Sequence, residues 1–167
     1  MKILVQTGKN NQILRTVSEE ITTNEIRKYS KIGEEMVKFI KDSNNGGVGL
    51  AAPQVGISKR LICVSLLRSY DDESFKTIFM INPRILEHST TTDFDKEGCL
   101  SVPKEFGEVE RFTELKLSYL DSKGKENILF LKGIAARIVQ HEVDHLDGIL
   151  FTDKVVTRDN KDDEHVF

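Results

Sequence analysis

The stretch QHEVDHLDG, from Gln140 to Gly148, decides the fold. It places His141 and His145 four residues apart, and side chains at this spacing are neighbours on a helix surface. Ile134 and Ile138 fall on the same stripe, which would normally face a protein core. The sequence therefore predicts a helix that turns two imidazoles inward.

Glycines mark both ends of this predicted helix, which runs from about Gly133 to Asp147–Gly148. A second amphipathic helix is predicted between residues 22 and 47, where apolar side chains recur at helical spacing. Thr22 or Thr23 is suited to cap its start, and Gly46–Gly47 to end it.

Strand signals fill much of the remaining chain. Apolar runs predict strands in RLICVSLL (60–67) and in KTIFMINPRIL (76–86), the second broken at Asn82–Pro83. The segment 114–131 alternates on both sides of DSKG, which predicts a β-hairpin. We expect an α+β fold in which antiparallel or mixed strands surround the central helix, with residues 1–153 as one domain and the polar, acidic residues 154–167 as a flexible tail.

Composition limits the class of protein. The chain has 167 residues, 38% of them hydrophobic and 31% charged, as is usual for a single soluble domain. The net charge of −3 argues against nucleic-acid binding, for which a basic patch is typical. No apolar run is long enough to cross a membrane, and the first residues show no signal peptide. We expect a cytoplasmic protein that binds neither membrane nor nucleic acid.

The histidine pair indicates a metal site. An H-E-x-x-H run on a helix brings two imidazole nitrogens close enough to share one ion, with Glu142 beside them as a general base. The alternative is a pair of ordinary core histidines. The run alone suggests a zinc peptidase, but Phe151 stands where the extended motif has its third histidine.

The third ligand is expected from a cysteine. Cys63 lies in an apolar run and is interpreted as a buried small hydrophobe. Cys99, in EGCLS, is the remaining candidate, because a thiolate binds divalent metals strongly. A Cys/His/His set leaves a coordination position for water, as catalytic sites do.

Three motifs together resemble the peptide deformylase family: GVGLAAPQ (Gly47–Gln54), EGCLS (Glu97–Ser101) and QHEVDH (Gln140–His145). Their order and spacing agree with the family, and the likeness extends from about Ile13 to Asp153. The resemblance implies an enzyme that removes the N-formyl group from the N-terminal formylmethionine of newly made proteins and releases formate.

The resemblance also implies a role for each residue of the site. Glu142 would move the water proton to the departing amine, and the Gln54 amide and the Leu100 N–H would stabilise the oxyanion. The backbone of Val48 and Gly49 would pair with the peptide as an added strand. The metal ligands would be Cys99, His141 and His145, and the methionine pocket would include Val48, Ile134 and Ile138.

Cofactor and partners follow from the same resemblance. It implies ferrous iron in the cell, although zinc, nickel and cobalt suit these ligands equally. The partners would be N-formylmethionyl peptides and nascent chains. Ribosome docking is in question, because an acidic tail stands where many members have a basic C-terminal helix.

Two charged residues near the motifs are assigned structural roles. Asp144 is expected to hold the helix in place through an ion pair with Arg111, and Arg137 is interpreted as a solvated or ion-paired residue outside the pocket. A general zinc endopeptidase and a non-catalytic metal or peptide-binding module are the competing hypotheses.

Overall fold

The computed structural model describes residues 1–158 and residue 167. No helix in this part of the chain combines the length and apolar character needed to cross a membrane. The helices are α1 (Gln12–Arg15), α2 (Ile26–Lys41) and α3 (Ile134–Leu146), with 3-10 turns at Thr23–Glu25, Ala52–Val55 and Phe151–Asp153. The strands are β1 (Gly49–Ala51), β2 (Leu61–Ser65), β3 (Thr77–His88), β4 (Thr92–Cys99), β5 (Val102–Phe112), β6 (Glu114–Leu120), β7 (Glu126–Lys132) and β8 (Val155–Arg158).

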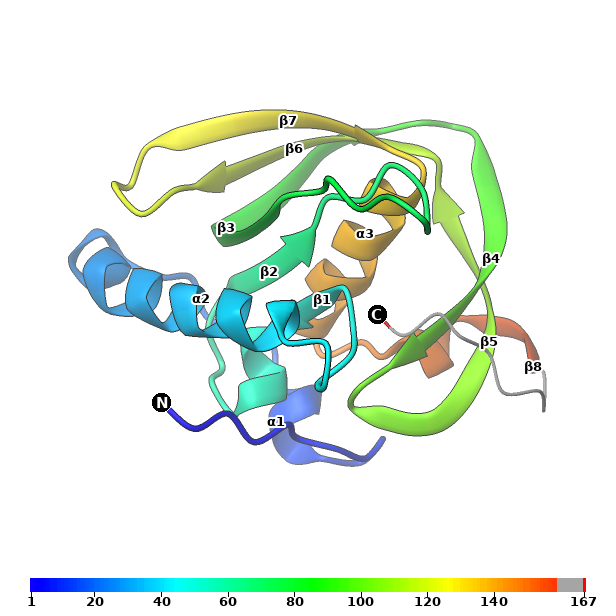
Figure 1. Ribbon diagram of the computed structural model, residues 1–167, viewed down its shortest axis with the longest axis horizontal. Helices are drawn as coiled ribbons and strands as arrows, with labels where there is room; N and C mark the ends of the chain where they lie inside the picture. The colour runs from blue at the N-terminus through cyan, green and yellow to red at the C-terminus, as the bar shows by residue number, and fades with distance from the viewer. Residues whose placement is uncertain (159–166) are drawn as a thin grey trace.

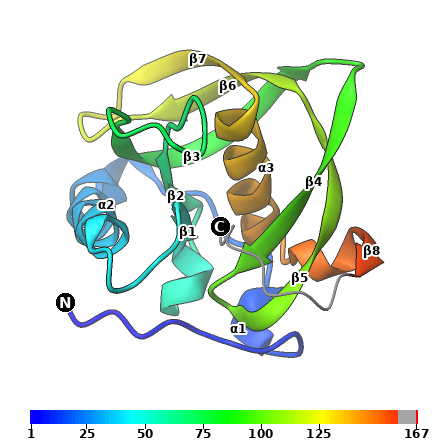
Figure 2. The ribbon, with the colours of Figure 1, turned by 45° about the vertical axis from the view of Figure 1, so that its right-hand side comes forward.

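Helix α3 lies between two antiparallel sheets (Figures 1 and 2). The larger sheet has the strand order β1-β2-β3-β6-β7, and the smaller one has the order β4-β5-β8. Strands β1 and β4 are therefore edge strands, one in each sheet. The expected α+β fold with antiparallel sheets is confirmed.

The core has one layer on each face of β2, and all five residues of this strand are buried. Ile62 and Val64 belong to the hydrophobic cluster that includes α3 residues, whereas Leu61 and Cys63 belong to the cluster that includes α2 residues. Alternate residues of a strand point to opposite faces. A strand between two helices must therefore be apolar at every position, which explains the run RLICVSLL and the burial of Cys63.

Helix α2 follows the predicted segment but ends at Lys41, before the glycines expected to stop it. At its start the Thr22 N–H donates to the Glu25 carboxylate (3.0 Å), ahead of the 3-10 turn that leads into the helix. Gly33 lies on the packed face, where an added Cβ would come within 2.5 Å of the Phe79 ring. This close approach explains a glycine inside the helix despite its low helix propensity.

The strand predicted to break at Asn82–Pro83 continues through these residues as β3, with an irregular register beside them. The Asn82 side chain accepts a hydrogen bond from the Ile21 N–H (2.8 Å) and donates one to the Ile21 carbonyl (2.9 Å). An amide side chain thus supplies pairing where the strand is irregular. The predicted hairpin is confirmed as β6 and β7, joined at residues 121–125.

Four strands, β1, β4, β5 and β8, were not anticipated. The long hairpin of β4 and β5 occupies residues 92–112, and β1 lies inside the segment interpreted as a glycine-rich loop. The expected flexible tail also differs in part, because residues 155–158 form β8 and pair with β5, and Phe167 is buried. The other tail residues, 159–166, lie outside the described part of the chain.

Gly148 closes the C-terminal end of α3 against α1. Its φ is +72°, and a Cβ there would lie 2.5 Å from the Arg15 carbonyl oxygen. The Arg15 guanidinium donates to the Gly148 carbonyl (3.2 Å) and forms an ion pair with Asp153 (2.6 Å). The position therefore requires both a left-handed backbone and the absence of a side chain.

We expect Gly148→Ala to lower the free energy of unfolding by about 2–4 kcal/mol, from the left-handed backbone and the clash together. Gly46→Ala is the matched control, because Gly46 has a similar φ of +69° but has no atom within 4 Å of an added Cβ. It should cost only about 1–2 kcal/mol. Urea denaturation measures both, and equal losses would contradict the steric part of this account.

Candidate metal centre and active site

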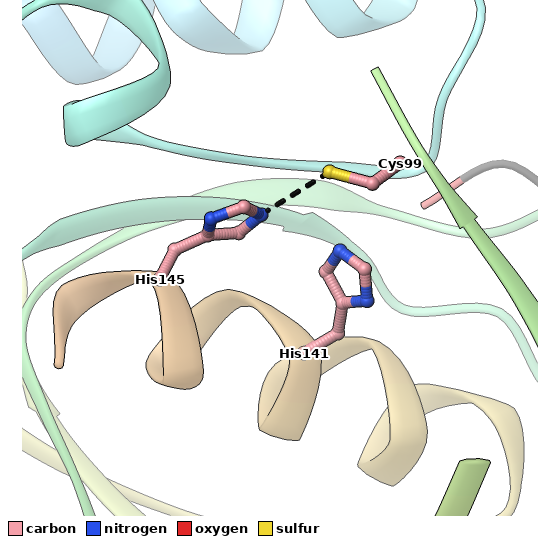
Figure 3. Close-up of side chains that lie close together, drawn as sticks. All are labelled: Cys99, His141 and His145. Atoms are coloured by element: carbon pink, nitrogen blue, oxygen red, sulfur yellow. Dashed lines mark hydrogen bonds between the residues drawn. The ribbon is translucent and has the colours of Figure 1, made fainter. Parts of the chain in front are cut away.

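Three side chains converge between α3 and the end of β4. His141 and His145 project from adjacent turns of α3, and Cys99 ends β4 opposite them (Figure 3). The Cys99 Sγ atom lies 3.4 Å from His145 Nε2. The candidate ligand atoms of all three lie within 4.8 Å of one another, and all three residues are buried.

Glu97 fixes the orientation of one imidazole. His141 Nδ1 lies 2.8 Å from Glu97 Oε1. An ionised carboxylate only accepts hydrogen bonds, so Nδ1 carries the proton and Nε2 is left with its lone pair. His141 Nε2 is buried and has no hydrogen-bond partner among the described residues. A buried lone pair without a hydrogen-bond partner indicates that His141 Nε2 binds a metal ion or another ligand.

The Glu97 carboxylate is itself fully paired. Besides His141, it accepts two hydrogen bonds from Arg111 (both 2.9 Å) and one from Arg137 (2.8 Å). Burial opposes its charge, but the hydrogen bonds from Arg111 and His141 hold the pKa of this carboxyl well below its usual value. It therefore stays ionised and remains hydrogen-bonded to residues of both α3 and β5.

Further charges complete this network. Arg111 reaches Asp144 (2.6 Å), which confirms the expected ion pair, and Lys154 also contacts Asp144 (2.9 Å). Arg137 is ion-paired to Asp93 (2.6 Å) and is buried rather than solvated. The network thus sets three cations against three carboxylates, and buried charges are tolerable only when they are balanced in this way.

Glu142 lies beside the two histidines without a partner of its own. It is fully buried, and neither carboxylate oxygen has a hydrogen-bond partner in the described structure. Burial, and next the negative charge of Glu97, raises the pKa of this carboxyl well above its usual value. A Cβ at Gly49 would lie 2.5 Å from Glu142 Oε1, so the glycine makes room for the acid. An acid that is held close but unpaired is suited to exchange a proton.

Gln54 directs its amide group at the sulfur. The Gln54 oxygen accepts a hydrogen bond from the Ala51 N–H (2.9 Å). Its NH2 group is therefore turned toward Ser101 Oγ (3.0 Å) and Cys99 Sγ (3.6 Å). These contacts place Gln54 beside a candidate ligand, and Leu100 directly follows Cys99 in the chain.

The protonation of the ligands depends on burial. Burial, and next the charge of Glu142, raises the pKa of the Cys99 thiol to about 12. Burial, and next His141, lowers the pKa of His145, which keeps this imidazole neutral. A thiol in such surroundings ionises only beside a cation, and a neutral imidazole is the form that binds one.

These residues fit a divalent metal ion. One sulfur and two imidazole nitrogens lie within 4.8 Å of one another, and His141 Nε2 has no hydrogen-bond partner among the described residues. Thiolate and imidazole ligands suit zinc, ferrous iron, nickel and cobalt. His141 is held from behind by a carboxylate, as metal-binding histidines usually are.

Two sheet edges flank the centre. Val48 O accepts from the Ser65 N–H of β2 (2.8 Å), so by alternation the backbone groups of Gly49 point to the free edge of β1. Strand β4, which carries Cys99, is the edge of the smaller sheet. Ile138 is fully buried in the α3 cluster, and Val48 and Ile134 pack against that cluster.

The sequence had not singled out Glu97 as a site residue. The signal was its place two residues before Cys99, since such residues share a strand face. This relation was missed because β4 was not predicted as a strand.

Comparisons with known proteins place the sequence in a family. The model of the polypeptide deformylase family matches residues 1–161. Peptide deformylase 1 of Clostridium acetobutylicum is 42% identical over 147 residues, covering 85% of this chain and 93% of that protein. A peptide deformylase of Prochlorococcus marinus is 33% identical over 160 residues, covering 93% and 79%.

Solved structures show the same fold. The peptide deformylase of Thermotoga maritima has a TM-score of 0.82 at 34% identity, with 94% of this chain and 99% of that chain covered. The Met-Ala-Ser-bound class I type b peptide deformylase of Acinetobacter baumannii has a TM-score of 0.83 at 38% identity, with 93% and 99% covered. With the sequence, the fold and the Cys/His cluster in agreement, this chain belongs to the peptide deformylase family, the enzymes that remove the N-formyl group from nascent chains.

Proposed function

We propose that Cys99, His141 and His145 hold one divalent metal ion, beside which Glu142 and Gln54 hydrolyse the formyl group of N-formylmethionyl peptides. The observation that carries this proposal is the unpartnered, buried His141 Nε2, held toward the Cys99 sulfur by Glu97. When bound, such an ion supplies a Lewis acid and lowers the pKa of water toward neutrality.

The reaction adds water across the formyl C–N bond and yields formate and a free amine. Glu142 takes a proton from the attacking water and delivers it to the amine nitrogen as the C–N bond breaks. Its buried, unpaired oxygens support this role, since no other group competes for the proton. The Gln54 NH2 group and the Leu100 N–H donate to the formyl oxygen as it gains negative charge.

The substrate lies as an extended chain between the two sheet edges. The Gly49 backbone, whose groups point to the free edge of β1, positions it there, as in other cases of strand addition. The Val48 carbonyl, which was expected to share this role, is already bonded to the Ser65 N–H of β2. The methionine side chain enters the apolar surface made by Val48, Ile134 and Ile138. All of these residues lie within residues 1–153, which we take as the catalytic domain.

The setting of the reaction is part of the proposal. N-formylmethionyl nascent chains in the cytoplasm are the partners, with no membrane or nucleic-acid contact. After α3, the described residues form only a 3-10 turn and β8. The described residues after α3 therefore contain no basic helix, and we propose that any association with the ribosome uses another surface.

Replacing Glu142 by Gln removes the proton acceptor without changing the side-chain size. We expect formate release from formyl-Met-Ala-Ser to fall by about 100-fold or more in kcat, while the metal content is unchanged. The measurements are formate release and metal analysis on the same preparation. Cleavage of internal peptide bonds without formate release by the unaltered enzyme would favour a zinc endopeptidase instead.

Gly49→Ala tests the role of Glu142 without changing Glu142 itself. The added Cβ would displace the Glu142 carboxylate from its place, so kcat should fall although every ligand and the base remain. Full activity in this variant would show that the position of Glu142 does not matter to the reaction.

Replacing Glu97 by Gln should loosen the whole centre. An amide cannot accept all four hydrogen bonds, and two arginines lose their buried counter-charge. We expect about 3–5 kcal/mol lower stability and roughly 10–100-fold weaker metal binding. Urea denaturation and metal titration measure the two effects.

Asp144→Asn is the control for this variant. The Asp144 side chain is 14% exposed, against 0% for Glu97, and contacts Arg111 rather than a ligand. Its loss of metal binding should be clearly smaller, without a changed preference for the first residue of the peptide. Equal losses in the two variants would show that charge balance, and not the Glu97–His141 hydrogen bond, secures the metal.

The identity of the ion is proposed to be ferrous iron in the cell, on the family resemblance alone. Anaerobic purification should then yield a protein with about one iron per chain, whose activity declines on exposure to air as the iron or Cys99 oxidises. Metal analysis and formate release before and after exposure measure this. Full, air-stable activity with zinc and no iron in that preparation would reject iron.

A further inference from the structure

Phe167 is buried beside the candidate active site, although it lies far along the chain from the catalytic motifs. Its side chain is 1% exposed. The ring meets the imidazole of His141 edge to face, with centroids 5.6 Å apart and planes at 87°. Figures 1 and 2 both draw the end marked C between β1 and the β4–β5 hairpin, beside α3.

The ring contacts the candidate ligand His141 and belongs to the hydrophobic cluster that contains the residues assigned above to the methionine pocket. Phe167 belongs to the same hydrophobic cluster as Ile138, and Val48 and Ile134 pack against this cluster. Ile134, Ile138 and His141 lie on α3, and Val48 directly precedes β1. An aromatic ring in this place excludes another large side chain, because protein interiors hold no spare volume of that size.

The backbone of Phe167 also binds where an added peptide would. Its N–H donates to the carbonyl oxygen of Gly98 (2.9 Å). Gly98 lies on the edge strand β4, next to Cys99. A backbone hydrogen bond to a sheet edge together with a side chain in a neighbouring apolar pocket is the mode by which extended peptides are recognised.

We propose that Phe167 is an intramolecular competitor of the substrate, occupying the side-chain pocket and the Gly98 carbonyl that a formylmethionyl peptide must use. This inference rests on the proposed function. The tether gives the phenylalanine a high effective concentration at the site, so a peptide must displace it before binding. The competition raises KM and leaves kcat unchanged, because the ring is absent from the complex that reacts.

The first test is Phe167→Ala in the full chain, assayed with formyl-Met-Ala-Ser. If the ring is in place in about 70–90% of molecules, its removal should lower KM by roughly three- to tenfold with kcat unchanged. Phe130→Ala is the control, since Phe130 is 77% exposed on β7 and should leave KM unaltered. An unchanged or raised KM for Phe167→Ala would overturn the proposal and make the ring a core residue.

The second test does not depend on turnover or on the alanine variant folding. The chain has no tryptophan, so Phe167→Trp introduces a single fluorophore at this place. Saturating Met-Ala-Ser should shift its emission to the red as the indole moves into water. Unshifted emission with the peptide bound, checked by calorimetry, would overturn the proposal. Absent formate release by the unaltered enzyme would reject the proposed function, while the emission shift still decides whether a peptide displaces the side chain.

Discussion

The buried carboxylate of Glu97 is the interaction on which the centre depends. It accepts four hydrogen bonds, from Arg111, Arg137 and His141, and so joins β4 and β5 to α3. Residues two apart on a strand share a face, and Cys99 follows Glu97 at that spacing. The strand that supplies the sulfur therefore also supplies the group that orients the opposing imidazole. Any shift of β4 relative to α3 would disturb both at once.

Helix α3 shows which polar groups serve the fold and which serve the chemistry. Arg137 and the Gln140 amide find partners on the hairpin, as buried polar groups must. The atoms left without a partner, among the described residues of this helix, are His141 Nε2, His145 Nδ1 and both oxygens of Glu142. Unpaired groups cost stability when buried, so their gathering at one place is expected of a site that a ligand completes.

The sequence predicted the parts of this architecture that follow from local pattern. Helical spacing gave α3 and its histidines, alternation gave the β6–β7 hairpin, and the need to hold the helix gave the Arg111–Asp144 pair. The β4–β5 hairpin escaped prediction because its buried positions hold charged residues, Glu97 and Arg111 among them. A charged side chain can be buried only if it is paired. Here the partners are distant in sequence, so the pairing becomes visible only in the folded structure. For the same reason the sequence left open whether Arg137 is solvated or ion-paired, and the structure shows it buried and ion-paired.

Two sheet edges border the centre, and they can pair either with a peptide substrate or with a segment of this same chain. An edge strand offers main-chain groups that any extended segment can satisfy, whatever its side chains. In the binding mode proposed above, discrimination must then come from the apolar cluster around Ile138 and from the reacting group itself. Phe167 offers a backbone N–H to the sheet edge and a large side chain to the apolar cluster, but it carries no formyl group. If peptides bind as proposed, largely through their backbone, the site is also open to a tethered segment of the same shape, which differs from a substrate in lacking the formyl group.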